Sequence, residues 1–149
     1  MKPGTKPIRR ALISVSDKTN LKDLGKFLEG LGVELISTGG TARYLKKVGL
    51  KVKEVSDITG FPEILNGRVK TLHPKVHAPI LFDRDDRGSI KELRKMGSNA
   101  IDLVVINLYP FETILKSRAP TKDIIENIDI GGVALMRAAA KNFDHVMVI

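Results

Sequence analysis

The sequence contains no cysteine and no tryptophan, and its apolar runs are only a few residues long. Without cysteine the chain can form no disulfide, no thiolate zinc site and no cysteine nucleophile. A membrane-spanning helix needs about 18 or more apolar residues in succession, and no run approaches that length. The first residues, Met1–Pro7, also lack the apolar stretch of a secretory signal. We therefore expect a soluble protein of the cytoplasm.

Length and composition are those of one ordinary domain. The chain has 149 residues, of which 42% are hydrophobic and 28% charged. These values are close to those of soluble globular proteins and unlike those of disordered chains or coiled coils. With no internal repeat and no linker-like segment, residues 1–149 are predicted to form a single domain.

The charge is strongly positive. Lys and Arg total 25 against 17 Asp and Glu, which gives a net charge of +8 and suits an anionic partner. Proteins that bind nucleic acid usually gather such charge on one face and interleave it with aromatic residues. Here only 5% of residues are aromatic, and no dense basic run occurs. A phosphate-bearing small molecule is therefore favoured over nucleic acid.

Short apolar runs alternate with helical patterns along the chain. The apolar runs are typical of strands, and they cover residues 11–15, 33–37, 51–55, 102–106 and 145–149. Leucines and Phe27 recur at the helical period over 21–31, and further helices are expected after residue 41, over 84–97 and from Gly132. The alternation predicts an α/β fold with three layers, α/β/α, around a mostly parallel sheet. Ligands of such sheets bind beyond the carboxyl ends of the strands.

Two polar loops follow predicted strands. Ser37–Thr41 reads Ser-Thr-Gly-Gly-Thr before a helix, where backbone amides and the helix dipole favour an oxyanion. Its spacing fits neither a Walker loop nor a dinucleotide fingerprint, and a plain turn capped by threonine is the alternative. Ser14–Lys18 is a second polar cluster, in which Lys18 either binds a phosphate or carbonyl oxygen or is merely solvated.

Residues 66–77 combine cations with a hydroxyl and two histidines. If the segment is extended, Arg68 and Lys70 point to the same side, because side chains alternate along a strand. Together with Thr71 they would form an anion or oxyanion site.

The two histidines of this segment have a second interpretation. His73 and His77 have the spacing of metal ligands on a helix. Pro74 argues against a continuous helix there, and no third ligand is evident. We therefore predict ordinary hydrogen-bonded histidines and no metal site.

A carboxylate precedes the Ala-rich helix and a lysine ends it. Asp129 either complements the helix dipole or serves as a base at the sheet edge. Lys141 at the other end is also explained by the dipole alone. A straight helix between Gly132 and Lys141 rises about 14 Å, so Asp129 and Lys141 share a small ligand only if the segment bends.

Seven segments occurring in one order together resemble a known family. They are Ser14–Thr19, Ser37–Ala42, Thr59–Glu63, Gly67–Pro74, Asn107–Phe111, Ile128–Gly132 and Arg137–Asn142. The chain resembles the IMP cyclohydrolase domain, in its N-terminal part, of the bifunctional purine-biosynthesis enzyme AICAR transformylase/IMP cyclohydrolase. The Ser-Thr-Gly-Gly-Thr loop is shared more widely, with the methylglyoxal synthase-like fold.

The resemblance implies the last step of inosine monophosphate (IMP) synthesis, a ring closure of 5-formamidoimidazole-4-carboxamide ribotide (FAICAR) with loss of water. It implies no cofactor and a homodimer. The residues implied to surround the closing ring as catalytic groups are Lys70, Tyr109, Asp129 and Lys141. Those implied to bind the substrate are Ser14, Ser16, Lys18, Thr38, Gly39, Gly40, Thr41, Arg68, Thr71, Asn107 and Gly131.

The chain departs from the family in two respects. Pro79 stands where the family commonly has glycine, and it removes a backbone donor. The chain also ends at Ile149, whereas the family's cyclohydrolase region continues and a transformylase domain usually follows, so formyl transfer is not expected of this chain. Two other readings stay open: a catalytically silent purine-nucleotide-binding module, and methylglyoxal synthase chemistry.

Overall fold

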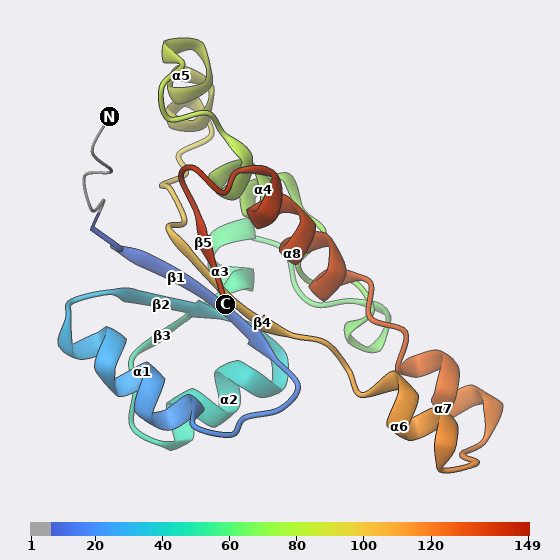
Figure 1. Cartoon of the computed structure of the whole chain (residues 1–149). Coiled ribbons are helices and arrows are strands. Elements are labelled where there is room, and N and C mark those ends of the chain that lie inside the picture. The colour runs from blue at the N-terminus through green and yellow to red at the C-terminus, as the bar shows by residue number, and fades with distance from the viewer. Residues whose placement is uncertain (1–6) are drawn as a thin grey trace.

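Five strands, all parallel, form one sheet in the order β3-β2-β1-β4-β5 (Figure 1). The computed structural model describes residues 7–149, so the start of the predicted domain and the segment tested for a secretory signal lie outside it. The strands are β1 (Arg10–Val15), β2 (Glu34–Ser37), β3 (Val52–Glu54), β4 (Leu103–Asn107) and β5 (Met147–Val148). Each predicted strand is thus confirmed, although β5 is shorter than predicted.

Helices connect the strands and cover both faces of the sheet (Figure 1). They are α1 (Leu21–Gly30), α2 (Gly39–Lys47), α3 (Val55–Thr59), α4 (Pro74–Leu81), α5 (Arg87–Lys95), α6 (Phe111–Lys116), α7 (Thr121–Glu126) and α8 (Gly131–Lys141), with a 3-10 turn, η1, at Leu65–Gly67. The predicted α/β class with a parallel sheet is confirmed.

Alternate residues of the central strands divide the core into two layers. Leu12 of β1 points to one face and packs with residues of α3, α4 and α8. Ile13, its neighbour, points to the other face and packs with residues of α1 and α2. Both side chains are fully buried, as expected for strands covered on both faces.

The packed stripe of α1 differs from the predicted one. Leu21, Gly25 and Leu28 are buried, whereas Phe27 and Leu31 are about two-thirds exposed. The small Gly25 allows α1 to approach Leu50 closely, since a Cβ there would lie 2.5 Å from a methyl carbon of Leu50. Because α1 packs through Leu21, Gly25 and Leu28, Phe27 lies outside its buried face.

Proline begins α4 rather than excluding it, so the expectation that Pro74 prevents a helix between His73 and His77 was wrong. Pro74 is the first residue of α4, where the missing N–H would have no partner in the helix anyway. His73 is the N-cap, and its Nδ1 accepts a hydrogen bond from the N–H of Lys75 at 3.1 Å. Pro79 lies buried inside the same helix, and its carbonyl accepts the N–H of Ile101.

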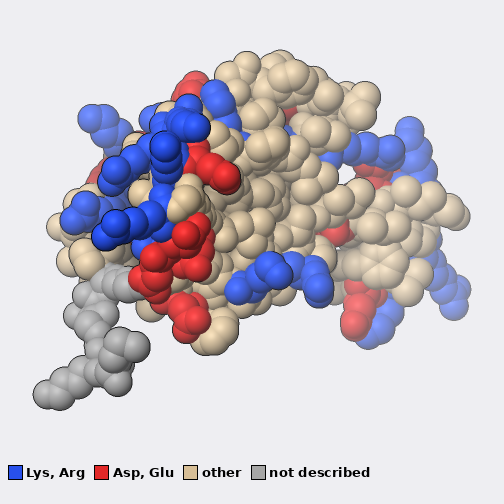
Figure 2. All heavy atoms as spheres, turned by 90° about the horizontal axis from the view of Figure 1, so that it is seen from above, with Lys and Arg blue, Asp and Glu red and all other residues tan. Residues whose placement is uncertain are grey.

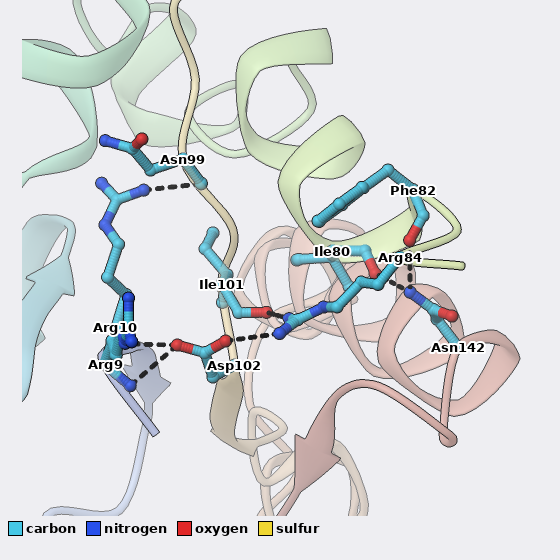
Figure 3. Close-up of polar contacts among 9 residues, drawn as sticks. All are labelled: Arg9, Arg10, Ile80, Phe82, Arg84, Asn99, Ile101, Asp102 and Asn142. Atoms are coloured by element: carbon cyan, nitrogen blue, oxygen red, sulfur yellow. Dashed lines mark hydrogen bonds and ion pairs between the residues drawn. The ribbon is translucent and has the colours of Figure 1, made fainter. Parts of the chain in front are cut away.

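A buried carboxylate joins the starts of β1 and β4 (Figure 3). Asp102 Oδ2 accepts the backbone N–H groups of Arg9 and Arg10 at 2.8 and 2.9 Å. Its Oδ1 pairs with Arg84 Nη1 at 2.7 Å, while Arg84 Nη2 donates to the carbonyl of Ile101. Asp102 therefore holds the register between strands that are far apart in the sequence.

Within residues 7–149, no helix is both long and apolar enough to cross a bilayer.

We predict that Asp102→Ala lowers the free energy of unfolding by about 3 kcal/mol, because two backbone donors and a mostly buried guanidinium lose their acceptor. Urea unfolding followed by circular dichroism measures the change. Asp144→Ala is the matched control, since Asp144 is exposed and its replacement should cost less than about 0.5 kcal/mol. Equal losses in the two variants would contradict the anchoring role of Asp102.

Candidate functional site

A cavity of about 430 Å³ opens at the carboxyl ends of β1, β2 and β4, in front of the first residues of α8. This is the edge of a parallel sheet where ligands are expected. The predicted site residues that line it are Ser14, Ser16, Lys18, Thr38, Gly40, Thr41, Arg68, Lys70, Thr71, Asn107, Tyr109, Asp129 and Gly131. Two other predicted residues, Gly39 and Lys141, are not among its lining.

The loop after β1 is held by a side chain from the neighbouring strand. Asn107 Oδ1 accepts the backbone N–H groups of Ser16 and Asp17 at 2.6 and 3.0 Å, and its Nδ2 donates to the carbonyl of Asp17. Lys18 Nζ folds back onto the carbonyl of Ser16 at 3.1 Å. The side-chain amide of Asn107 therefore fixes the conformation of the loop after β1. This loop places Lys18 at the cavity.

The N-terminus of α2 lines the cavity through Thr38, Gly40 and Thr41. Thr41 Oγ1 donates to the carbonyl of Val15 at 2.9 Å and accepts its N–H at 3.2 Å, which ties α2 to the end of β1. Thr38, the N-cap residue, makes no side-chain bond to the helix. An anion in the cavity therefore meets backbone N–H groups and the positive end of the helix dipole.

Two glycines allow close contacts at the start of α8. A Cβ on Gly131 would lie 2.6 Å from Thr71 Oγ1, and one on Gly132 would lie 2.5 Å from Asp129 Oδ2. Asp129 Oδ1 accepts the N–H of Gly132 at 2.7 Å. The carboxylate thus caps α8, as the helix-dipole interpretation expects, while it also lines the cavity.

An ion pair stands at the rim of the cavity. Arg68 contacts the carboxylate of Glu126 through Nη2 and through Nε, the latter at 3.3 Å. The hydrogen bond lowers the pKa of the Glu126 carboxyl and raises the pKa of Arg68. Arg68 has helical backbone angles and follows η1, so the segment is not extended there as the same-side argument supposed.

The second histidine of the 66–77 segment, His77, does not line the cavity but is hydrogen-bonded to the backbone of Thr71, which does. His77 is half-buried, and burial lowers the pKa of its imidazole, while a hydrogen bond to the backbone of Thr71 opposes that shift. Its Nε2 is buried without a hydrogen-bond partner among the described residues. A neutral His77 therefore supports Thr71, the buried residue that faces Gly131.

Lys141 lies apart from the other predicted groups. The helix α8 is continuous from Gly131 to Lys141, so the two ends are separated by about 15 Å. Lys141 is exposed in the last turn. The helix does not bend in the way that sharing one small ligand with Asp129 requires.

Several lining residues were not predicted. They are Val15, Asn66, Gly67, Leu72, Ile125, Glu126, Ile128, Ile130 and Gly132. Six of the nine belong to η1 or to residues 125–130, at the end of α7 and just before α8, where no helical or strand period is strong. A signal that was available is the Asn66-Gly67 pair, which is typical of left-handed turn conformations, and both residues have positive φ.

The surface charges are mixed on the face seen from above. Lys and Arg gather at two ends of this face, with Asp and Glu among them and a broad uncharged area between (Figure 2). This face carries no continuous basic stripe of the kind that tracks a nucleic-acid backbone.

Comparisons with known proteins agree with this arrangement. A family described as MGS-like domain matches residues 20–134. The bifunctional purine biosynthesis protein PurH of Elusimicrobium minutum is 58% identical over 144 residues, which cover 95% of this chain and 28% of that protein. PurH of Dinoroseobacter shibae is 57% identical over 143 residues, covering 96% of this chain and 27% of that protein.

A solved structure is also similar. The crystal structure of ForH matches with a TM-score of 0.78 and 36% identity, covering 98% of this chain and 74% of ForH. This chain thus spans 27–28% of the length of the two PurH proteins and most of ForH. The chain belongs to the MGS-like domain family, and its similarity to the PurH proteins confirms the family resemblance that the seven sequence segments predicted.

Proposed function

We propose that this domain is an IMP cyclohydrolase, which closes FAICAR to IMP with loss of water. The observation that carries the proposal is the convergence of residues from distant segments on one cavity at the carboxyl edge of the sheet. The similarity to PurH, a purine biosynthesis protein, supports a purine-precursor nucleotide as the substrate.

The phosphate of the nucleotide would bind at the start of α2. Backbone N–H groups of Gly40 and Thr41 and the positive end of the helix dipole suit a dianion. Lys18 and Arg68 add positive charge on either side of this site. The hydroxyl of Thr41 is occupied by Val15, so its contribution comes from its backbone N–H.

The closing ring would lie near Asp129, Lys70 and Tyr109. The carboxamide nitrogen attacks the formyl carbon, and a C–N bond forms as the formyl C=O bond becomes a C–O⁻ bond. Asp129 takes the proton from the nitrogen through Oδ2, which accepts no hydrogen bond from the described residues. Lys70 stabilises the oxyanion and Tyr109 orients the base. The oxyanion takes back, from Asp129, the proton lost by the attacking nitrogen, and the resulting hydroxyl leaves as water with a second proton donated by Lys70. As that C–O bond breaks, the formamido nitrogen returns its own hydrogen to Lys70 and the ring C=N bond forms.

The proposed function is the closure of FAICAR to IMP and no other reaction. Because the chain spans little more than a quarter of the PurH proteins, formyl transfer is not proposed for it. The homodimer and the cytoplasmic location stay predictions. Exposed apolar side chains next to the cavity, Ile125, Ile128, Ile130 and Val133, support the homodimer as the surface a second copy would cover.

The predicted role of Lys141 as a catalytic group beside the closing ring stays a hypothesis. Its distance from Asp129 along α8 argues that within one chain it does not touch the same small ligand. A domain that binds purine monophosphates without turnover, the second reading of the sequence, is distinguished by the kinetic experiment below.

We predict that the purified chain converts FAICAR to IMP and that Lys70→Ala lowers kcat by about 100-fold or more, as expected for loss of an oxyanion-stabilising group. Ultraviolet absorbance follows the reaction. Lys75→Ala is the matched control, since Lys75 does not line the cavity, and its kcat should stay within about twofold of the parent's.

Three outcomes separate the hypotheses. Turnover that survives Lys70→Ala contradicts the assigned role. Tight binding of IMP without turnover favours the silent module, and production of methylglyoxal from dihydroxyacetone phosphate would favour the third reading.

We predict that Asp129→Asn lowers kcat by about 100-fold, because an amide cannot accept the proton of the attacking nitrogen. The asparagine oxygen still accepts the N–H of Gly132, so the melting temperature should change little. Full turnover with the parent's pH profile would show that Asp129 is only a helix cap.

A further inference from the structure

One of the seven segments, Thr59–Glu63, has no part in the function proposed above. It follows α3 and leads into a short return of the chain, in which Ile64 pairs with Val69 in an isolated antiparallel bridge. This turn of the chain places Glu63 near Gly67 and Lys70. Glu63 does not line the cavity, yet its carboxylate contacts Thr38, which does.

This contact is with the N-cap of α2. Thr38 is buried, and its Oγ1 donates a hydrogen bond to Glu63 Oε1. A threonine at this position ordinarily turns its oxygen to the N–H groups of the first helical turn. Here Thr38 makes no such cap, so the amides of α2 that face the cavity stay available to a ligand.

The Lys70 ammonium also lies near Glu63, although no ion pair joins the two side chains among the described residues. A Cβ on Gly39 would lie 3.3 Å from Lys70 Nζ and 3.7 Å from Glu63 Oε1, and one on Gly67 would lie 3.6 Å from Lys70 Nζ and from Glu63 Oε2. The ammonium and the carboxylate therefore stand over the same two glycines.

Glu63 also restricts what Thr38 can do. A hydroxyl has one hydrogen to donate, and that of Thr38 is given to Glu63. The hydroxyl therefore has no hydrogen left for a phosphate oxygen. Thr38 serves the site through its backbone and through the position of its side chain.

We propose that Glu63 is a positioning residue, which holds the Thr38 hydroxyl away from the amides of α2, so that these amides bind the phosphate of the nucleotide. The identity of that nucleotide rests on the function proposed above. The role in phosphate binding rests only on the contacts of Glu63.

Whether removal of the Glu63 carboxylate weakens or tightens IMP binding distinguishes a positioning role from simple charge repulsion. A carboxylate that merely lies near the phosphate weakens its binding, so removing it would tighten binding. A positioning carboxylate has the opposite effect: Glu63→Ala should raise the Kd for IMP by about tenfold, because the Thr38 hydroxyl loses its acceptor and is free to cap the amides of α2. Glu63→Gln retains an acceptor for Thr38, and its Kd should stay within about threefold of the parent's.

The experiment is isothermal titration of the parent and each variant with IMP and with inosine, which lacks the phosphate. The proposal expects the loss in Glu63→Ala for IMP and an unchanged Kd for inosine. Thr38→Val has no hydroxyl to turn onto the α2 amides, so its Kd for IMP should stay near the parent's, and the double variant should bind IMP more tightly than Glu63→Ala alone. Glu92→Ala, an exposed glutamate of α5, is the control and should bind as the parent does.

A second readout does not depend on the nucleotide. Inorganic phosphate is titrated while the amide NMR signals of Gly40 and Thr41 are followed. Phosphate should shift these signals in the parent and shift them less in Glu63→Ala, even if the chain turns out not to convert FAICAR. Tighter IMP or phosphate binding in Glu63→Ala, equal loss for IMP and inosine, or no shift in the parent would each overturn the role of Glu63.

Discussion

The pairing of β1 with β4 is the interaction on which the site depends. These strands are separated by about 90 residues, and Asp102 fixes their register by accepting the N–H groups of Arg9 and Arg10. The same register places Val15 opposite Asn107, whose amide then holds the loop after β1. An anchor at the amino ends of the strands thus determines the shape of the cavity at their carboxyl ends.

Backbone geometry and balanced charge together make the cavity suitable for an anionic ligand. The amino ends of α2 and α8 both face it, and Lys18, Arg68 and Lys70 surround it. Two of these cations are held by the protein itself: Arg68 pairs with Glu126 at the rim, and Lys18 donates to the carbonyls at the end of β1. Both are therefore in position before any ligand binds.

The parts of the fold that could be predicted from the sequence are those with strong periodicity. The β4 strand is a continuous apolar run, and it forms as predicted. The helices α6 and α7 were not predicted because they are short and bury no residue, so they carry no apolar stripe. The prediction for Pro74 was wrong for a different reason. A proline breaks a helix in its interior but is tolerated at its first position, and the sequence alone did not show that His73 is the N-cap of α4.

The sequence by itself determined the α/β class, the order of the strands along the chain and most of the residues that line the cavity, because short apolar runs and polar loops are local patterns. Only the tertiary structure decided which of these residues meet. It separated Lys141 from Asp129, because an unbroken helix sets the distance between its ends, and it brought Glu63 to Thr38. Contacts between distant segments depend on packing and register, and a local pattern does not contain them.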